Sequence, residues 1–292
     1  MTLKWKITVF KGNIMALGIN TNIASLTAQN QLSKSQNMSN QAMERLASGL
    51  RINSAKDDAA GLAISTRFDT QIRGLNQAVR NAGDGISMVQ TAEGGMDQTV
   101  ENLQRIRELA VQAANGSLSN EDRALLQKEV EQRVSEIERI KDETKFNGIT
   151  VLDGNSASNT AIQVGADQGE KITIALNESL GISNLGTASK VSDVSVSTAA
   201  NASNALAIID GALSTVNTIR ADLGAVQNRF ESTISNLQTN IENQSASQSR
   251  ILDADFASET AKMAKANVLQ QAGISVLAQA NARPNQVLSL LQ

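Results

Sequence analysis

The stretch from Leu46 to Ser65 reads LASGLRINSAKDDAAGLAIS and sets a few apolar residues around a polar centre. Gly49 stands near its start, and a polar run precedes the second glycine at position 61. Ser54 followed three residues later by Asp57 fits a capping box, in which the two side chains satisfy backbone N–H groups at a helix start. We therefore expect one helix to end near Gly49 and another to begin near Ser54.

This segment can bury little apolar surface within its own chain, so its expected partner is another chain. Its large apolar residues and two adjacent carboxylates form the candidate packing segment, which comprises Leu46, Leu50, Ile52, Asp57, Asp58, Leu62 and Ile64. Such a segment in the middle of helical sequence points to assembly.

The composition favours long helices over a compact core. Of 292 residues 41% are hydrophobic, yet only 2% are aromatic, and the chain holds one proline and no tyrosine. Compact cores usually rely on aromatic side chains, and the scarcity of proline permits uninterrupted helices. The predicted fold is mostly α: a long antiparallel coiled-coil helical bundle with a small β-hairpin region, whose terminal helices pair on assembly.

Charge and cysteine content exclude several classes of protein. The net charge is −3, from 26 basic and 29 acidic residues that are well interspersed. No basic block indicates binding to nucleic acid or to an anionic membrane surface. No stretch approaches the roughly 18 apolar residues of a membrane span. The absence of cysteine removes disulfides and thiolate metal sites from consideration.

A sustained apolar stripe predicts a long helix from about Thr66 to Ala114. Its members follow steps of three, four and seven residues, typical of a coiled-coil seam: Leu75, Val79, Ala82, Ile86, Val89, Met96, Val100 and Leu103. Four glycines lie inside the helix, at 83, 85, 94 and 95. Because each costs about 1 kcal/mol relative to alanine there, we expect them to admit a closely approaching helix. A kink or break is the alternative.

The middle of the chain alternates helical and extended patterns. A capping box at Ser119–Asp122 opens another stripe that runs to Ile140, and Asn147-Gly148 signals a turn. Between Thr150 and Leu176 the apolar period becomes two, around a turn at residues 167–169, which predicts a β-hairpin. Residues 181–202 read as loop or short strand. A third stripe, from Leu206 to Ile241, predicts a helix of about 40 residues antiparallel to the first.

The two ends of the chain resemble each other. Residues 19–49 and 245–292 are rich in alanine, glutamine and serine, with thinly spaced large apolar residues. Arg283-Pro284 interrupts the pattern before a final apolar cluster. Neither end buries enough apolar area to offset its chain entropy. We expect the ends to pair with each other and with the ends of neighbouring subunits.

No arrangement of residues suggests catalysis, a cofactor or a metal site. Asp57 and Asp58 are adjacent, so on a helix they would point about 100° apart and share neither a proton nor a metal ion easily. Without histidine or cysteine there is no Ser-His or Cys-His nucleophile and no zinc-protease motif. No glycine-rich loop follows a strand and opens a helix. We predict that the chain is not an enzyme.

Several segments, together with Leu46–Ser65, match one family in the same order. They are MALGINTNIASLTAQNQL (Met15–Leu32), NAGDGISMVQTAEGGM (Asn81–Met96), LQRIRELAVQAANG (Leu103–Gly116), FNGITVLDG (Phe146–Gly154), ILDADFASETAKMAKANVLQQAGISVLAQAN (Ile251–Asn281) and VLSLLQ (Val287–Gln292). The chain resembles bacterial flagellin, the subunit of the extracellular flagellar filament. The resemblance implies self-assembly for swimming motility, without large central outer domains because the middle is short.

The resemblance also implies partners and contact residues. Flagellins leave the cell unfolded through the flagellar type III pathway after an export chaperone has bound the C-terminal segment, and they add beneath a filament cap on a hook–filament junction. Candidate contacts with the vertebrate innate flagellin receptor are Gln104, Arg105, Leu109, Gln112 and Glu129. Candidate contacts with cytosolic inflammasome sensors are Val287, Leu288, Leu290 and Leu291.

The expected domain organisation follows the same resemblance. Residues 15–60 and 245–292 are the two parts of an inner helical core domain, residues 61–154 and 204–244 the two parts of a long-helix domain, and residues 155–203 a variable hairpin region. Residues 1–14, MTLKWKITVFKGNI, are expected to be an upstream extension with Met15 as initiator; an additional strand is the alternative.

Two other functions use the same scaffold. One is the hook–filament junction protein, which shares terminal helices with flagellin. The other is a flagellin-like surface adhesin that holds a polysaccharide at the hairpin region, although that region offers almost no aromatic side chains to stack on sugars.

Overall fold

The computed structural model describes residues 21–154, 159–176, 180–182, 184–185 and 190–289. Residues 1–14, expected to be an extension, lie outside them. The chain divides into two compact units. The central unit is Arg67–Ser247, and the terminal unit combines the residues up to Thr66 with those from Gln248 onward. Each unit is therefore considered by itself.

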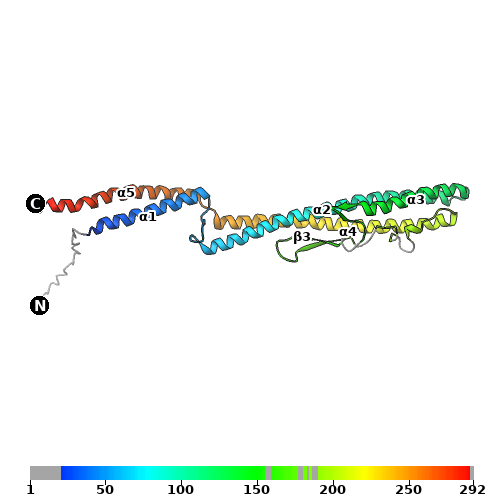
Figure 1. Ribbon diagram of the computed structural model, residues 1–292, viewed down its shortest axis with the longest axis horizontal. Coiled ribbons are helices and arrows are strands. Elements are labelled where there is room, and N and C mark those ends of the chain that lie inside the picture. The colour runs from blue at the N-terminus through cyan, green and yellow to red at the C-terminus, as the bar shows by residue number, and fades with distance from the viewer. Residues whose placement is uncertain (1–20, 155–158, 177–179, 183, 186–189, 290–292) are drawn as a thin grey trace, which may run out of the picture. The chain divides into compact units, whose positions relative to one another are not determined.

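Three helices build the central unit: α2 (Ala59–Ala114), α3 (Asn120–Glu143) and α4 (Ala199–Leu252). Figure 1 shows them running alongside one another. Ion pairs join Arg107 to Asp210 and Arg220 to Asp97. Residue numbers therefore increase along α2 in the direction in which they decrease along α4. The predicted antiparallel pairing is confirmed. Helix α4 spans 54 residues, more than the about 40 expected for it.

The glycines inside α2 do not break it, since the helix is continuous over 56 residues. Two of them allow close packing. A Cβ on Gly85 would lie 2.8 Å from the ring of Phe230, and one on Gly95 would lie 2.7 Å from Leu152. Phe230 and Leu152 are both fully buried. The expected close approach of another helix therefore holds at Gly85, whereas Gly95 admits residues outside the helices and Gly83 and Gly94 face open space.

Apolar residues from all three helices and the hairpin form one continuous core. Its most completely buried large members are Met96, Leu103, Ile106, Leu109, Ile137, Leu152, Ile174, Leu180, Leu185, Ile209, Leu223 and Phe230. A smaller cluster around Leu75 and Leu237 extends the packing toward the other end of the unit. The core thus follows the predicted stripes, as expected for long helices buried along one face.

The extended segments form two small antiparallel pairs. β1 (Lys145–Phe146) and β2 (Ile149–Thr150) are joined by Asn147-Gly148, with φ of 48° and 80°. These left-handed angles are what a two-residue turn between paired strands requires. β3 (Asn159–Gln163) pairs with β4 (Lys171–Ala175), which confirms the hairpin. A short 3₁₀ helix, η2 (Val191–Asp193), lies in the segment expected to be loop or short strand.

The terminal unit is built on α1 (Ile23–Ser48) and α5 (Phe256–Ser289), which lie side by side in Figure 1. The connection after α1 meets the connection before α5. Gly49 ends α1 at φ 73°, Ala254 N–H donates to the Gly49 carbonyl, and Arg51 N–H donates to the Leu252 carbonyl. The expected pairing of the two ends of the chain with each other is confirmed, and their pairing with neighbouring subunits stays a prediction.

The predicted start of the second helix near Ser54 is wrong, since α2 begins at Ala59. The hydrogen bonds of the capping pair do form, but they close a turn. One Asp57 carboxylate oxygen, Oδ2, accepts from the N–H groups of Asn53 and Ser54 at 3.3 and 3.1 Å. The cap of α2 is Asp58, whose Oδ1 accepts from the Gly61 N–H at 2.9 Å.

Proline 284 does not end the last helix, because α5 continues to Ser289. A proline supplies no N–H to the carbonyl four residues earlier, which here is that of Ala280. The Asn22 side-chain NH₂ donates to this carbonyl at 2.8 Å, while its oxygen accepts from the Ser25 N–H and caps α1. One asparagine thus completes both helices.

Candidate assembly surface

Small side chains form the contact between α1 and α5. The buried residues of α1 are Ser25, Ala28, Ser35, Ser39 and Ala42, and those of the described part of α5 include Glu259, Ala266 and Ala280. Hydrogen bonds tie the two helices together: Ser25 Oγ donates to Asn281 Oδ1 at 2.8 Å, and Ser39 Oγ donates to Asn267 Oδ1 at 3.2 Å. The two helices lie close together but bury few large apolar groups against each other.

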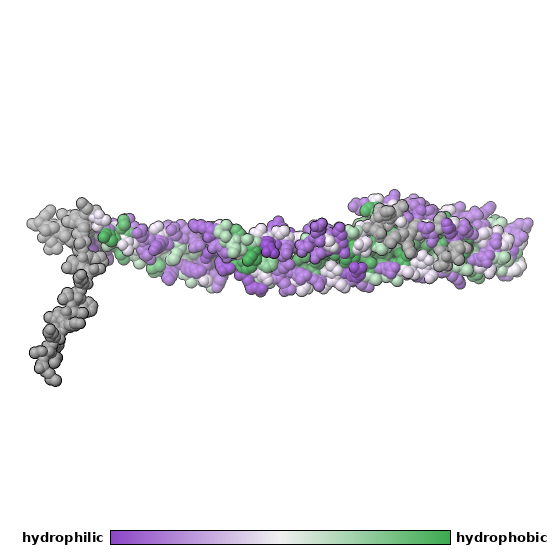
Figure 2. Space-filling model, turned by 90° about the horizontal axis from the view of Figure 1, so that it is seen from below, coloured by the Kyte–Doolittle hydropathy of each residue, from purple (hydrophilic) through white to green (hydrophobic). Residues whose placement is uncertain are grey.

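Large apolar side chains instead remain on the surface of the terminal unit. Twelve such residues are exposed in the described chain, and nine of them belong to this unit: Ile23, Leu26, Met38, Met43, Ile64, Phe256, Val268, Ile274 and Val276. Their exposed fractions run from 44% to 65%. The face shown in Figure 2 is mostly hydrophilic, with apolar areas set among polar residues. Apolar side chains gathered on the surface of one helix pair indicate a site that contacts another protein.

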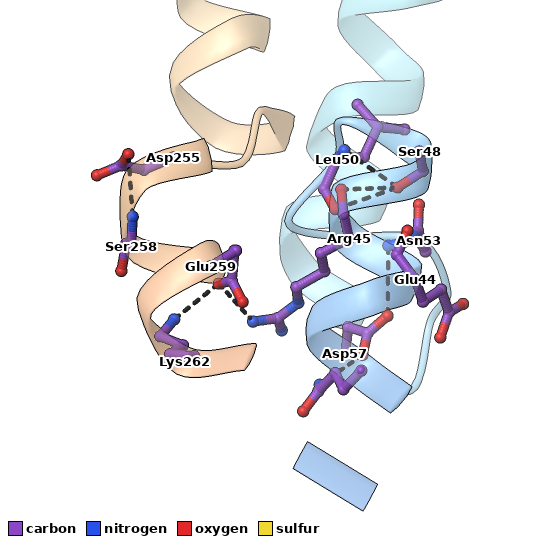
Figure 3. A network of polar contacts seen from close by, with 11 residues as sticks. Glu44, Arg45, Ser48, Leu50, Asn53, Asp57, Asp255, Ser258, Glu259 and Lys262 are labelled. Carbon is purple, nitrogen blue, oxygen red and sulfur yellow. Dashed lines mark hydrogen bonds and ion pairs between the residues drawn. The ribbon is translucent and has the colours of Figure 1, made fainter. Parts of the chain in front are cut away.

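A charged network fixes α5 to α1 (Figure 3). Arg45 Nη1 lies 3.3 Å from Glu259 Oε1, and Lys262 Nζ lies 2.7 Å from the same oxygen. The hydrogen bond from Lys262 and the charge of Arg45 lower the pKa of Glu259, although its burial opposes the shift. Arg45 Nε is buried without a hydrogen-bond partner in this structure. The sequence alone did not single out this network, because Arg45 lies 214 residues from Glu259.

The turn around Asp57 is polar and exposed. Its carboxylate accepts from the backbone and hydroxyl of Ser54, and Gln41 Nε2 lies 3.4 Å from Oδ1. The Ser54 hydroxyl is the main cause of the lowered pKa of Asp57. The carboxylate therefore stays ionised and holds the turn, which is a structural use of the residue.

The remaining members of the candidate packing segment differ in their accessibility. Leu46, Leu50 and Leu62 are half-buried, and Ile64 is 45% exposed. Ile52 is only 3% exposed, and a Cβ on Gly61 would come within 2.7 Å of its Cδ1. Ile52 thus packs within its own chain, and its side chain is not available to a neighbouring subunit.

The candidate receptor residues lie on α2 and α3 of the central unit. Gln104, Arg105 and Gln112 are exposed, and Arg105 Nε donates to Glu129 Oε1 at 2.9 Å. This hydrogen bond lowers the pKa of Glu129 and raises that of Arg105, so both groups remain charged. Leu109 is 1% exposed and belongs to the core. It supports the surface from beneath and cannot be a contact in this conformation.

Of the candidate tail residues, Val287 and Leu288 fall within α5, whereas Leu290 and Leu291 lie outside the described residues. None of the helices in the described part of the chain combines the length and apolar character needed to span a membrane. Within the same residues, no group of three or more acidic, histidine or cysteine side chains is placed to hold a metal ion.

Family models match both ends of the chain. The model of the bacterial flagellin N-terminal helical region matches residues 19–157, and that of the C-terminal helical region matches residues 206–291. A flagellin of Halalkalibacterium halodurans is 47% identical over 274 residues, which cover 94% of this chain and 99% of that protein. This chain belongs to the flagellin family. A flagellin of Xenorhabdus nematophila is also 47% identical, covering 95% of this chain and 100% of its own.

These relationships establish that the chain is a structural subunit of the flagellar filament and self-assembles into it. The junction-protein alternative is not favoured, because the relatives of high identity and coverage are flagellins. A solved structure of a proposed flagellar hook-associated protein from Vibrio parahaemolyticus matches with a TM-score of 0.57, covering 68% of this chain and 100% of that one. At 15% identity it shows a shared fold alone. With 292 residues the chain is a short flagellin.

Proposed function

We propose that the nine exposed apolar residues of the terminal unit are the surface that other copies of this chain cover in the filament. The observation that carries the proposal is the contrast between the seam of alanine and serine inside the unit and the larger apolar groups outside it. Burying the exposed half of each side chain contributes about 1 kcal/mol, and the nine together on the order of 10 kcal/mol. This is comparable with the cost of immobilising a subunit.

Seeded polymerisation of the full-length chain tests this proposal. In Val268→Asp, a carboxylate replaces an apolar side chain that is 65% exposed on α5. Burying that charge costs several kcal/mol, so we expect elongation to fall at least tenfold while the helical content of the central unit is unchanged. Val268→Leu keeps the apolar surface and should elongate normally.

A second control places the same charge on the central unit. Leu125 is also 65% exposed, and Leu125→Asp is expected to elongate far better than Val268→Asp. Electron microscopy and sedimentation of polymer would both report the difference. Normal filaments from Val268→Asp, or equal loss from both aspartate variants, would refute the assignment of assembly to the terminal unit.

We further propose that the chain works outside the cell and leaves it unfolded through the flagellar type III pathway. The C-terminal segment, with Phe256, Val268, Ile274 and Val276 exposed on α5, is suited to an export chaperone that covers apolar side chains before assembly. The filament cap and the hook–filament junction would be the partners at the two ends of the polymer. Purification of the chaperone with the intact chain, and its loss on truncation after Arg250, would support the chaperone site.

The group formed by exposed Gln104, Arg105 and Gln112 and half-buried Glu129 is our proposed contact with the vertebrate innate receptor. Its support is the surface position of these side chains and the Arg105–Glu129 ion pair, which holds the arginine in one orientation. Arg105→Ala should reduce signalling in a receptor reporter assay by tenfold or more, roughly the effect of one lost charged contact. Lys190→Ala, far from this group in the sequence, is the control. The tail from Val287 to Leu291 is proposed to meet inflammasome sensors, which truncation at Arg283 would test.

A further inference from the structure

Two of the methionines in the described part of the chain are exposed on α1. Met38 is 44% exposed and Met43 is 57% exposed. Met88 and Met96, on α2, are 2% and 1% exposed and belong to the central core. The same chain therefore carries one accessible pair and one protected pair of the same residue.

The exposed pair lies on both flanks of the contact with α5. Met43 lies five positions after Met38, which on a helix of 3.6 residues per turn places the two about 140° apart. The buried stripe of Ser35, Ser39 and Ala42 runs between these two directions. Each methionine thus belongs to a different edge of the helix pair. A subunit with neighbours on either side would cover both.

We propose that Met38 and Met43 are oxidation sites, and that their sulfoxides prevent the free subunit from entering the filament. This inference rests on the proposed use of the terminal unit as the assembly surface. A sulfoxide is polar and a strong hydrogen-bond acceptor, so its burial among apolar neighbours without a donor is unfavourable. Once the subunit has assembled, the same covering shields both sulfur atoms from the oxidant.

The oxidant is a peroxide, and the reaction balances with hydrogen peroxide. A lone pair on the thioether sulfur attacks one peroxide oxygen, and the O–O bond breaks. The oxygen now bonded to sulfur gives its proton to the departing hydroxide, which becomes water. Sulfur loses two electrons and the peroxide gains them. The reaction can be reversed by methionine sulfoxide reductases, so reduction of oxidised chain should restore its elongation rate.

Peptide mass spectrometry of hydrogen peroxide-treated chain tests accessibility. Because Met38 and Met43 are at least 20 times more exposed than Met88, we expect the pair to oxidise at least about tenfold faster in free subunits. In preformed filaments the advantage should shrink to below about threefold. Met88 and Met96 are internal controls in both samples. Equal rates at all four positions in free subunits would overturn the proposal, as would unchanged oxidation of the pair in filaments.

Seeded assembly tests the consequence. Oxidised wild-type chain should elongate at least tenfold more slowly than untreated chain, while an oxidised Met38→Leu/Met43→Leu chain should keep its rate. If the leucine chain is also inhibited, oxidation acts elsewhere and the proposal fails. Met38→Gln and Met43→Gln imitate the polar sulfoxide without oxidant and should each slow elongation; normal elongation of both would contradict the proposal.

These outcomes are separable from failure of the assembly proposal itself. Val268→Asp reports on the assembly surface without any oxidation step. If that variant assembles normally, the surface is wrongly placed. If it does not assemble while oxidised wild-type chain does, the surface stands and the oxidation inference alone is refuted.

Discussion

The close packing of Gly85 against Phe230 allows a double-mutant cycle whose outcome follows from the geometry. Phe230 is fully buried, so Phe230→Ala should destabilise the central unit by about 3–5 kcal/mol. In the wild-type chain, a Cβ at Gly85 would lie 2.8 Å from the ring. Gly85→Ala then gains about 1 kcal/mol of helix propensity but loses about 1–3 kcal/mol through overpacking. The net effect is neutral to destabilising by about 2 kcal/mol.

Removing the ring removes the obstacle. In the Phe230→Ala background the new methyl group at position 85 enters space that the ring occupied, so Gly85→Ala should stabilise by about 1 kcal/mol. The coupling between the two substitutions is therefore expected at about 1–3 kcal/mol. A Cβ added at Gly83, two residues earlier on α2, would have no side chain or other segment within 4 Å. Gly83→Ala should stabilise both backgrounds equally, by about 0.5–1 kcal/mol.

Urea unfolding of monomeric chain, followed by circular dichroism, measures all of these free energies. The reasoning fails if Gly85→Ala changes the free energy of unfolding equally with and without the Phe230 ring. It also fails if Gly83→Ala couples to Phe230 as strongly as Gly85→Ala does, because only Gly85 contacts the ring.

Three further perturbations test other features of the fold. Arg123, 6% exposed, donates to the carbonyls of Ala113 and Asn115. Arg123→Ala should lower the free energy of unfolding in urea by about 2–4 kcal/mol, because these acceptors lose a charged donor. An unchanged urea midpoint would contradict this. Glu259 has a folded pKa below its ordinary value of 4.5, so its stabilising contribution is present above that pH and is lost as the pH falls through the folded pKa. Filaments of Glu259→Gln should therefore dissociate more readily than wild-type filaments at neutral pH, and the two should dissociate equally in acid. A difference in dissociation that grows as the pH falls would contradict this pH dependence. Gly148→Ala, at φ 80°, should destabilise the β1–β2 turn by about 1–2 kcal/mol, and thermal melting should distinguish it from a neutral Gly→Ala change at an open position.

Much of the central unit could be predicted from sequence because its signals are local. The apolar stripes of α2, α3 and α4 each repeat over several turns. The capping box at Ser119 forms as expected, with the Asp122 N–H donating to Ser119 Oγ at 3.1 Å and the Asp122 carboxylate accepting from the Ser119 N–H. The turn at Asn147-Gly148 requires left-handed backbone angles that these two residue types tolerate well.

The start of α2 illustrates where local signals mislead. Ser54 and Asp57 have the spacing of a capping box, and their hydrogen bonds form. The chain nevertheless remains in a turn until Asp58 supplies the cap. The cap is thus Asp58 and not the predicted Ser54, and the turn between them lies beside Ile52, which is buried close to Gly61. Sequence spacing alone does not contain that contact.

The sites of the terminal unit depend on pairing between distant residues. Asn22 supports the carbonyl of Ala280, which Pro284 leaves without its usual donor. The Arg45–Glu259 pair likewise joins two chain ends. Each residue taken alone reads as an ordinary polar side chain on a helix. Leu109 illustrates the opposite error, because its neighbours on α2 are exposed while its own side chain points into the core.

The connection between the two chain ends also fixes an order of folding. The bond from Arg51 Nη2 to the Ile251 carbonyl closes a loop of 200 residues, whereas the central unit is one continuous segment. Closing so long a loop in an unfolded chain costs about 2–3 kcal/mol more than closing one of about ten residues. Once α2 and α4 have packed against each other, the two ends of that loop are already close in space. We therefore expect the central unit to fold first and the two chain ends to join after it.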